Sequence, residues 1–317
     1  MLASRTSGRA NGVSVCSPAA SLMEPSPTSP PSPRCTLVTP TYLPDLARCE
    51  LLVESVQRSC PGLAHHLIVD HRDLRHFRHL ADRTTIITSE DLLPWWVRRL
   101  PGRRSIWLSV RSRPTRGWII QQVLKIATAS ALDADVSIFC DSDVAFIRPF
   151  SPSALIDEAD ASVGLLDVEF VNDEVKRWTA IAAGLLGLEP SDLPPRGHVG
   201  NMISWRRDNV IGMTKRVEET TGIDWRAALM RLPTFSEYIL YGSYTRGVLG
   251  YEHSGHHPVA LPLVKASWGV DLRDEKAFDD FFATFDPATI AVMIHSKDGI
   301  DPTRYRRQLE QMWVKGP

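Results

Sequence analysis

Apolar residues in the first half of the chain fall into blocks with two different spacings. Compact apolar runs, typical of buried strands, occupy residues 35–39, 66–70, 84–88 and 136–139. Between them, apolar residues three and four positions apart predict amphipathic helices over residues 46–59 and 118–132. Strands that alternate with helices are typical of a mostly parallel sheet flanked by helices. We therefore expect an α/β fold whose ligands bind at the carboxyl ends of the strands.

The start of the chain lacks this pattern. Residues 1–20 are rich in Ser, Gly and Ala, and residues 24–33 intersperse Pro with Ser and Thr. A segment of this composition buries too little apolar surface to offset the entropy lost on ordering. We predict a disordered leader over residues 1–34 and a single folded domain over residues 35–317.

Composition narrows the functional classes. The chain has 317 residues, is 43% hydrophobic and 23% charged, and carries a formal net charge of −1. A nearly neutral chain gives no general electrostatic reason to bind nucleic acid or anionic membranes, and we expect no nucleic-acid partner. Basic clusters occur at Arg98-Arg99, at Arg103-Arg104 and within residues 111–116. For the first two, a solvated basic surface is the favoured interpretation.

The cysteines and the hydropathy of the chain indicate the cellular compartment in which the protein is expected. The 5 cysteines form no CxxC pair and no regular spacing, which indicates reduced thiols in a reducing compartment. No apolar stretch approaches the length of a membrane span, and the N-terminus lacks the apolar core of a secretory signal. We expect a cytoplasmic protein that is not an integral membrane protein.

Two carboxylates follow the apolar run at residues 136–139. Asp141 and Asp143 lie two positions apart, where the chain leaves the predicted sheet. Burying an unpaired carboxylate is costly, and a hard divalent cation is a natural partner. Mg²⁺ and Mn²⁺ prefer oxygen ligands and often share their coordination shell with a substrate diphosphate. The pair therefore predicts a metal site, with an ordinary acidic turn as the structural alternative.

Further polar residues follow the first two predicted strands. Thr39, Thr41 and Tyr42 come after the first strand, and Asp70 ends the second. Because the carboxyl ends of parallel strands meet along one edge, we expect these side chains near the two carboxylates, where a nucleoside would bind. A simple turn and a strand-end cap are the structural alternatives. The chain has neither GxGxxG after its first strand nor a Walker GxxxxGK[ST], which disfavours dinucleotide oxidoreductases and P-loop enzymes.

Several stretches resemble a known family. Residues 37–42 (Leu-Val-Thr-Pro-Thr-Tyr) and 141–144 (Asp-Ser-Asp-Val) resemble motifs of GT-A-fold glycosyltransferases. Residues 116–125 and 236–242 are similar to stretches of a less studied group of bacterial glycosyltransferase-like proteins. The resemblance covers roughly residues 35–300.

The resemblance implies a GT-A-like (Rossmann-like) domain in which residues 35–150 bind a nucleotide-sugar and residues 151–317 bind the acceptor. The implied reaction moves a sugar, as a hexosyltransferase does, from a nucleoside-diphosphate sugar such as a UDP-sugar. Asp141 and Asp143 match the Asp-x-Asp motif that holds the metal against the diphosphate, which would make Asp143 a catalytic residue.

The predicted helix at residues 118–132 adds candidate donor-binding residues. Arg116 precedes it and Lys125 lies within it, and either side chain is suited to neutralise phosphate oxygens. Gln122 is a third candidate, four positions after Trp118 and therefore on the same side of the helix. A helix face in contact with solvent is the structural alternative.

The second half supplies candidates for the acceptor side and for a third metal ligand. Glu237 stands between Ser236 and Tyr238, a mixture of groups that suits a carbohydrate site. If the enzyme inverts configuration, Glu237 is the candidate general base. His295 and Lys297 follow an apolar run at residues 290–294. In retaining GT-A enzymes a late His completes the metal shell and a nearby Lys contacts the diphosphate, so the resemblance implies these roles. The stereochemical outcome stays open, as do structural roles for Glu237 and His295.

The prediction is therefore a glycosyltransferase that depends on Mn²⁺ or Mg²⁺ and takes a nucleotide-sugar donor and a carbohydrate or other small acceptor. A sugar-phosphate nucleotidyltransferase is an alternative, although residues 39–44 lack its glycine-rich, basic loop. A non-catalytic carbohydrate-binding relative is the third possibility.

Overall fold

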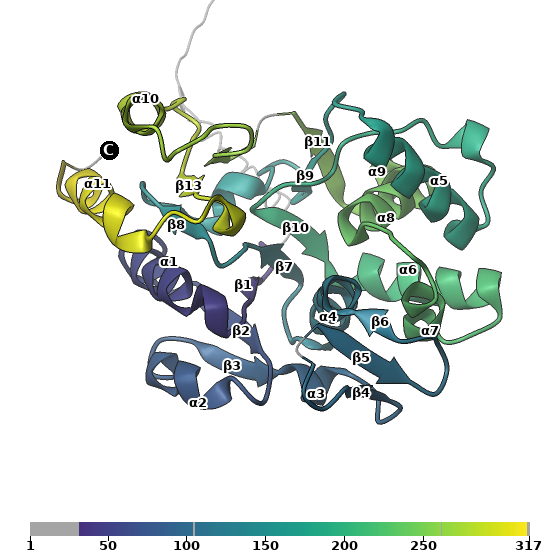
Figure 1. Cartoon of the computed structure of the whole chain (residues 1–317). Helices are drawn as coiled ribbons and strands as arrows, with labels where there is room; N and C mark the ends of the chain where they lie inside the picture. Colours follow the sequence, from purple (N-terminus) through teal and green to yellow (C-terminus); the bar gives the residue numbers. More distant parts are fainter. Residues whose placement is uncertain (1–31, 104, 261, 316–317) are drawn as a thin grey trace, which may run out of the picture.

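A five-stranded sheet forms the centre of the molecule (Figure 1). The structure, a computed structural model, describes residues 32–103, 105–260 and 262–315. In spatial order the strands are β10 (Ile203–Arg206), β7 (Val136–Phe139), β1 (Cys35–Pro40), β2 (Ala64–Val69) and β3 (Thr85–Thr88). β1 is parallel to β2 and β7, β2 is parallel to β3, and β10 is antiparallel to β7. The carboxyl ends of the four parallel strands therefore meet along one edge.

Helices cover both faces of this sheet, because successive strand residues are apolar and point to opposite sides. Val38 and Phe139 share a core with α4 (Gly117–Ala131), α5 (Asp173–Leu186), α6 (Arg207–Thr221), α7 (Trp225–Met230) and α8 (Glu237–Tyr244). Leu37 and Ile138 share another core with α1 (Leu46–Ser59). The other helices are α2 (Leu74–Phe77), α3 (Ser89–Leu92), α9 (Tyr251–Ser254), α10 (Glu275–Ala283) and α11 (Pro302–Lys315).

Three small sheets surround the central one. They comprise β12 (Val264–Ala266), β13 (Ala291–Met293) and β8 (Val144–Phe146); β11 (His256–Val259) and β9 (Val163–Leu166); and β4 (Val97–Arg99), β5 (Ile106–Ser109) and β6 (Thr115–Arg116). Short 3-10 segments are η1 (Leu43–Asp45), η2 (Arg78–Leu80), η3 (Pro152–Leu155), η4 (Pro190–Asp192) and η6 (Ser296–Asp298), and η5 (Thr245–Leu249) is a π-helical turn. Since β13 is antiparallel to β8, it brings the chain after Met293 back beside Asp143.

Local sequence explains how individual helices begin and end. α5 begins where the side chain of Asn172 accepts a hydrogen bond from Val175 N at 2.8 Å, and it ends at Gly187, whose φ of 66° is left-handed.

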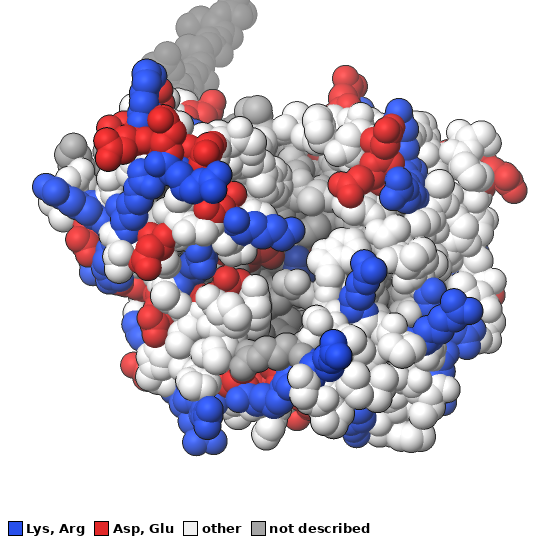
Figure 2. Space-filling view, viewed as in Figure 1, with Lys and Arg blue, Asp and Glu red and all other residues white. Residues whose placement is uncertain are grey.

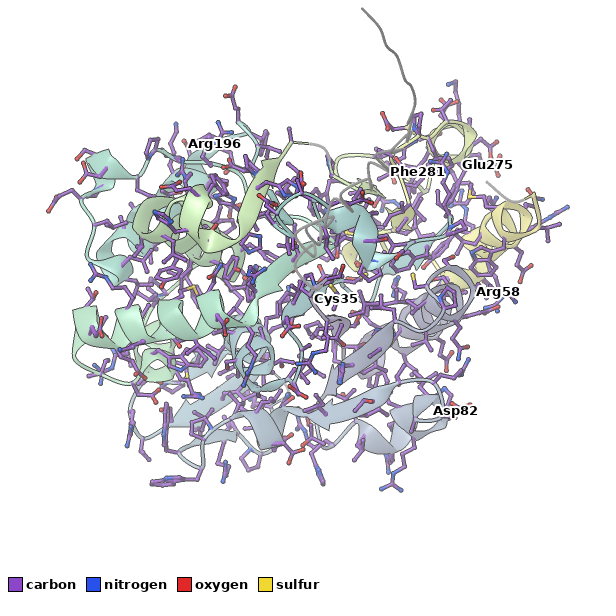
Figure 3. All side chains as sticks on the ribbon, turned by 180° about the vertical axis from the view of Figure 1, so that it is seen from behind. Cys35, Arg58, Asp82, Arg196, Glu275 and Phe281 are labelled. Atoms are coloured by element: carbon purple, nitrogen blue, oxygen red, sulfur yellow. The ribbon has the colours of Figure 1, made fainter. Side chains whose placement is uncertain are left out.

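Viewed from behind, Figure 3 shows Cys35, the first residue of β1, near the middle of the molecule. Arg58, labelled in the same figure near the end of α1, lies 5.0 Å from the centre of the Trp313 ring and so ties α1 to α11.

The predicted fold class is confirmed: the chain forms an α/β fold with a mostly parallel central sheet flanked by helices. The predicted strands and helices of the first half correspond to β1, α1, β2, β3, α4 and β7, with ends within two residues. Residues 1–31 of the predicted leader lie outside the described residues, and the leader and domain boundaries stay predictions. Cys35, Cys49, Cys60 and Cys140 are free thiols. Among the described residues, no helix is long and apolar enough to cross a membrane.

Candidate functional site

The two carboxylates predicted to bind metal lie just beyond the carboxyl end of β7. Asp141 is half-buried, and its backbone N–H donates to Oδ1 of Asn201 at 2.8 Å. Asp143 is 9% exposed, and its Oδ2 accepts a hydrogen bond from Ser296 N at 2.9 Å. Its Oδ1 is buried and has no hydrogen-bond partner among the described residues. A carboxylate oxygen left in this state is suited to a cation that the protein does not itself provide.

The charge around Asp143 is unbalanced. Burial raises the pKa of Asp143 to about 7, and the neighbouring Asp141 carboxylate adds to the rise. Asp45 contributes in the same direction, and burial also raises the pKa of Asp45 even though Arg48 lies 3.5 Å from its Oδ1. Two buried carboxylates, Asp45 and Asp143, thus lie near the half-buried Asp141. A bound cation would relieve their repulsion and hold Asp143 ionised.

Carboxylate oxygens are the right donors for Mg²⁺ or Mn²⁺. Among the residues that the structure describes, no group of three or more His, Cys, Asp or Glu side chains is arranged to hold a metal ion. The arrangement is therefore not that of a complete protein cage. It fits a cation held by one or two carboxylates that takes its other oxygens from a bound substrate and water.

His295 belongs to the same neighbourhood through its backbone. The residues on either side of it, Ile294 and Ser296, both donate to Asp143: Ile294 N to the backbone oxygen at 3.1 Å and Ser296 N to Oδ2 at 2.9 Å. The His295 side chain is partly exposed, with Nδ1 3.9 Å from Oδ1 of Asp298. Lys297 is exposed in η6. The structure thus brings His295 beside Asp143, and its role as a ligand stays a prediction.

A buried lysine links Asp141 to Glu237. The Nζ atom of Lys125, on α4, lies 3.4 Å from Oδ1 of Asp141, 3.0 Å from Oε1 of Glu237 and 2.8 Å from the hydroxyl of Tyr238. Burial opposes the charge of Lys125, but the attraction of Asp141, Tyr238 and Glu237 holds its pKa well above the usual value. Lys125 therefore stays a cation inside the protein, between two carboxylates from distant parts of the chain.

Gln122 is buried between α4 and α8. It is 2% exposed, and its Oε1 accepts a hydrogen bond from the backbone N–H of Glu237 at 2.9 Å. Ser236 caps α8, since its Oγ accepts from Ile239 N at 3.3 Å. Gln122 and Ser236 thus fix the start of α8 against α4 and place Glu237 at Lys125. These contacts give Gln122 a structural role, and donor binding by Gln122 stays a hypothesis.

A cavity of about 330 Å³ opens at the carboxyl ends of β1 and β2. Its walls include Thr41, Tyr42 and Asp70 from the sheet side and Trp118 and Gln121 from α4. Tyr42 is 50% exposed and Trp118 is 47% exposed, so two aromatic rings stand at its rim. Neither Asp141 nor Asp143 lines this cavity, but Tyr42 at its rim directly precedes η1, which contains Asp45.

The remaining residues that were predicted to bind the donor differ in their position relative to this cavity. Asp70 is buried and forms ion pairs with Arg72 and Arg99, so its charge is compensated within the protein. Thr39 is fully buried, with Oγ1 3.0 Å from Nε2 of His65, and it is not part of the cavity wall. Arg116 is exposed at the start of α4. Their proposed contacts with a donor stay predictions.

Two residues of the neighbourhood were missed by sequence reasoning. Asn201 binds Asp141 N through Oδ1 and donates from Nδ2 to Sδ of Met293 at 3.0 Å, which ties the carboxylates to β13. It is followed by Met202, whose φ of 61° is unusual for a residue other than glycine and marks local backbone strain. The second residue that sequence reasoning missed is Asp45, the third carboxylate of this neighbourhood. Gly197 and Gly200 precede Asn201, but nothing in the local pattern marks Asn201 as a partner of Asp141.

Comparison with known proteins gives the family. The model of a family of unknown function, DUF6492, matches residues 34–316. The chain belongs to this family. No curated protein matches the chain. Two solved structures of LgtC are similar to it: one is described as an active-site mutant, the other as a galactosyltransferase in complex with donor and acceptor sugar analogues.

The likeness to the LgtC structures is distant. The identities are 14% and 13%, the TM-scores are 0.44 and 0.43, and each comparison covers 87% of this chain and 95% of the other. With scores this low, a functional proposal has to rest on the residues of this chain. Those residues offer a place for a hard cation, a nearby cavity with an aromatic rim, and a buried lysine, Lys125, in contact with Asp141.

Proposed function

We propose that this chain is a metal-dependent glycosyltransferase of the GT-A type, which moves a sugar from a nucleoside-diphosphate sugar, such as a UDP-sugar, to an acceptor. One observation carries the proposal: the buried Oδ1 of Asp143 lacks a hydrogen-bond partner among the described residues, beside two further carboxylates and a cavity at the carboxyl ends of parallel strands. A carboxylate kept in this costly state is more readily explained by a bound cation than by stability.

The cation would be Mn²⁺ or Mg²⁺, with Asp143 and Asp141 as its protein ligands and His295 as a further candidate. When bound, it would stabilise the negative charge that develops on the departing diphosphate. Hydrogen bonds from two other segments orient Asp141 and Asp143. Asn201 fixes the backbone at Asp141, and Ser296 N orients the Asp143 carboxylate through Oδ2, leaving Oδ1 available.

The nucleoside of the donor would occupy the cavity. Its volume of about 330 Å³ lies in the range of small-molecule sites. The half-exposed rings of Tyr42 and Trp118 offer faces on which a base can stack, and stacking tolerates any base. Asp70 and Thr41 on the sheet side supply polar atoms to orient the ribose. The diphosphate would then lie between the cavity and Asp143.

The contacts of Glu237 bear on the reaction route. A general base must be free to take a proton from the acceptor, and Glu237 is held 3.0 Å from the charged Lys125 in a buried pair. The ion pair engages the Glu237 carboxylate with a cation of the protein itself. We propose that Glu237 is a positioning residue that keeps Lys125 beside Asp141. This arrangement supports a route without a general base at this position.

The test is product analysis with Mn²⁺ and a panel of nucleotide-sugars, with water or simple sugars as acceptors. Release of the nucleoside diphosphate supports glycosyl transfer. Release of pyrophosphate from a nucleoside triphosphate and a sugar phosphate would instead show a nucleotidyltransferase. Donor binding with neither product would leave a carbohydrate-binding relative. Asp143→Ala should reduce diphosphate release by at least about 100-fold, because it removes a ligand of the metal that stabilises the leaving group.

A further inference from the structure

The charge of this nearly neutral chain is unevenly distributed along its sequence. Residues 92–132 contain eight Lys and Arg residues and no Asp or Glu. In the structure this stretch forms α4 and the small sheet of β4, β5 and β6. Figure 2 shows Lys and Arg with few acidic atoms over the lower right part of the molecule, where Figure 1 places β4, β5, β6 and α7. This basic region differs from the mixed charges over α10 and α11.

The register of the small sheet gives it two different faces. Arg98 of β4 lies opposite Leu108 of β5, and Ile106 of β5 lies opposite Arg116 of β6. Residues paired in register share a face, and residues two apart along a strand do too. One face therefore carries an apolar middle strand, with Ile106 and Leu108, between two arginines on the outer strands. The other face carries Val97, Trp107 and Thr115, which are buried.

Exposed apolar side chains extend the outward face. Val110, two residues beyond Leu108, is 78% exposed, and its backbone N–H donates to Trp96 O at 3.4 Å. That bond places it next to the turn of Trp95, whose side chain is 71% exposed. Arg98 reaches the same turn, since its guanidinium donates to Pro94 O at 3.3 Å. A Trp, a Val and a Leu thus stand in water at the edge of a basic sheet.

Among the residues that the structure describes, the arginines of this face and of the segments that join its strands have no carboxylate partner. Within the described part of the chain, Arg98, Arg103, Arg111, Arg113 and Arg116 form no ion pair with a carboxylate. All five are exposed. Such residues keep their full attraction for an external polyanion, weakened only by salt.

We propose that the outward face of β4–β6, with Trp95 and Val110, docks on the surface of an anionic lipid bilayer. Basic side chains attract the phosphate groups of acidic lipids, and Trp is favoured at the membrane–water interface. Apolar side chains beside the arginines add burial in the headgroup region, as in interfacial helices. A soluble polyanion such as nucleic acid would use the arginines but would gain little from an exposed Val and Leu. The combination therefore favours a membrane surface.

The position of this face relative to the cavity gives the docking a consequence. Trp107, on the inner face of the same sheet, lines the cavity together with Ser105 and Gly117. The sheet thus separates the cavity from the proposed membrane surface by one layer. A docked molecule would hold the cavity one sheet layer away from the bilayer. The docking itself does not depend on the proposed glycosyltransferase activity.

The experiment is co-sedimentation of the full chain with vesicles of phosphatidylcholine alone or with about one third phosphatidylglycerol. We expect binding only to the anionic vesicles, decreasing as salt rises. Two variants test the two parts of the face. The first is Arg103→Glu with Arg113→Glu, since neither side chain has a contact to lose within the described residues. The second is Trp95→Ser with Val110→Ser. Each should reduce partitioning by at least about tenfold.

A matched control changes the same charge elsewhere. Arg177 on α5 and Arg307 on α11 are both exposed, and Arg177→Glu with Arg307→Glu should leave vesicle binding within about twofold of the wild type. Absence of binding to anionic vesicles would overturn the proposal, as would an equal loss in the control variant. If the charge variant loses binding and the Trp95–Val110 variant does not, the face binds polyanions in general, and the membrane assignment is wrong. A heparin-binding measurement on the same variants would confirm that outcome.

Discussion

At the scale of single residues, Asp143 shows the conflict between stability and function. Its carboxylate is buried with one oxygen unpartnered among the described residues, and burial with the nearby Asp141 raises its pKa to about 7. Ionising such a group in the folded protein is costly. The unfolded chain has no such cost, so Asp143 lowers the stability of the metal-free protein wherever it must ionise.

The sign of this effect can be tested. Because the pKa of Asp143 in the folded protein lies above its ordinary 3.8, stability falls as pH rises from about 4 to about 7 and stays reduced above that. Asn cannot ionise, so Asp143→Asn should stabilise the metal-free protein at pH 8 on the order of 1–3 kcal/mol and much less at pH 5. Urea unfolding at both pH values measures this.

The exposed Asp279 on α10 gives the control for this measurement, since Asp279→Asn removes a carboxylate that water already solvates. Its effect should stay within about 0.5 kcal/mol at either pH. An Asp143→Asn effect that is the same at pH 5 and pH 8 would mean that the carboxyl is not strained in the folded state.

Sequence reasoning found the residues of this site better than their partners. Asp141 and Asp143 were predictable, because two carboxylates directly after an apolar run are visible in the local pattern. Lys125 and Glu237 were each singled out, but as separate donor and acceptor residues. Their ion pair was not predictable, since it depends on how α4 and α8 pack. The hydrogen bond that Gln122 accepts from Glu237 N was not predictable for the same reason.

At the scale of elements, α8 is the helix that carries Glu237 to Lys125, and its packing leaves little room. All of its residues, 237–244, are buried. A Cβ atom built on Gly242 would lie 2.3 Å from a ring carbon of His198. The imidazole of His198 cannot move freely, because its Nδ1 lies 2.7 Å from the backbone oxygen of Leu166. Gly242 is therefore required for the close approach of His198 to α8.

Gly242→Ala should therefore destabilise the protein by about 3 kcal/mol through overpacking and should displace Glu237 from Lys125. The matched control is Gly184→Ala in α5, where a Cβ atom would have nothing within 4 Å. That change should stabilise by about 0.5–1 kcal/mol, because Ala is the better helix former. Thermal unfolding of both variants measures the contrast. Equal effects of the two substitutions would show that His198 yields to the added methyl group.

The larger elements were predictable and the small ones were not. α1, α4 and the strands of the central sheet have clear apolar spacing over enough residues to reveal their type. The strands β4, β5 and β6 have two to four residues each and contain three arginines, so no alternation was visible in residues 97–116. The clusters at Arg98-Arg99 and Arg103-Arg104 were interpreted as solvated surface. Only the register of the folded sheet shows that apolar residues stand among the arginines.

At the scale of the whole molecule, the site depends on segments from both halves of the chain. β1 and β7 supply Tyr42 and the two carboxylates, and the return of the chain through β13 supplies the backbone N–H of Ser296. Asn201, before β10, joins the two halves through Asp141 and Met293. The individual segments that carry these residues could be identified from the sequence. Their convergence needed the antiparallel pairing of β13 with β8, which no local pattern specifies.

The central claim is that Asp143 helps to hold a divalent cation against a nucleoside diphosphate. Calorimetric titration of the full chain with UDP, in Mn²⁺ and again in EDTA, tests it most directly, with wild type, Asp143→Ala and Asp279→Ala compared where all three are folded. We predict that Mn²⁺ tightens UDP binding at least about tenfold in wild type and in Asp279→Ala, and that Asp143→Ala loses this dependence because an oxygen ligand is gone. An unchanged Mn²⁺ dependence in folded Asp143→Ala, or none in the wild type, would contradict the account.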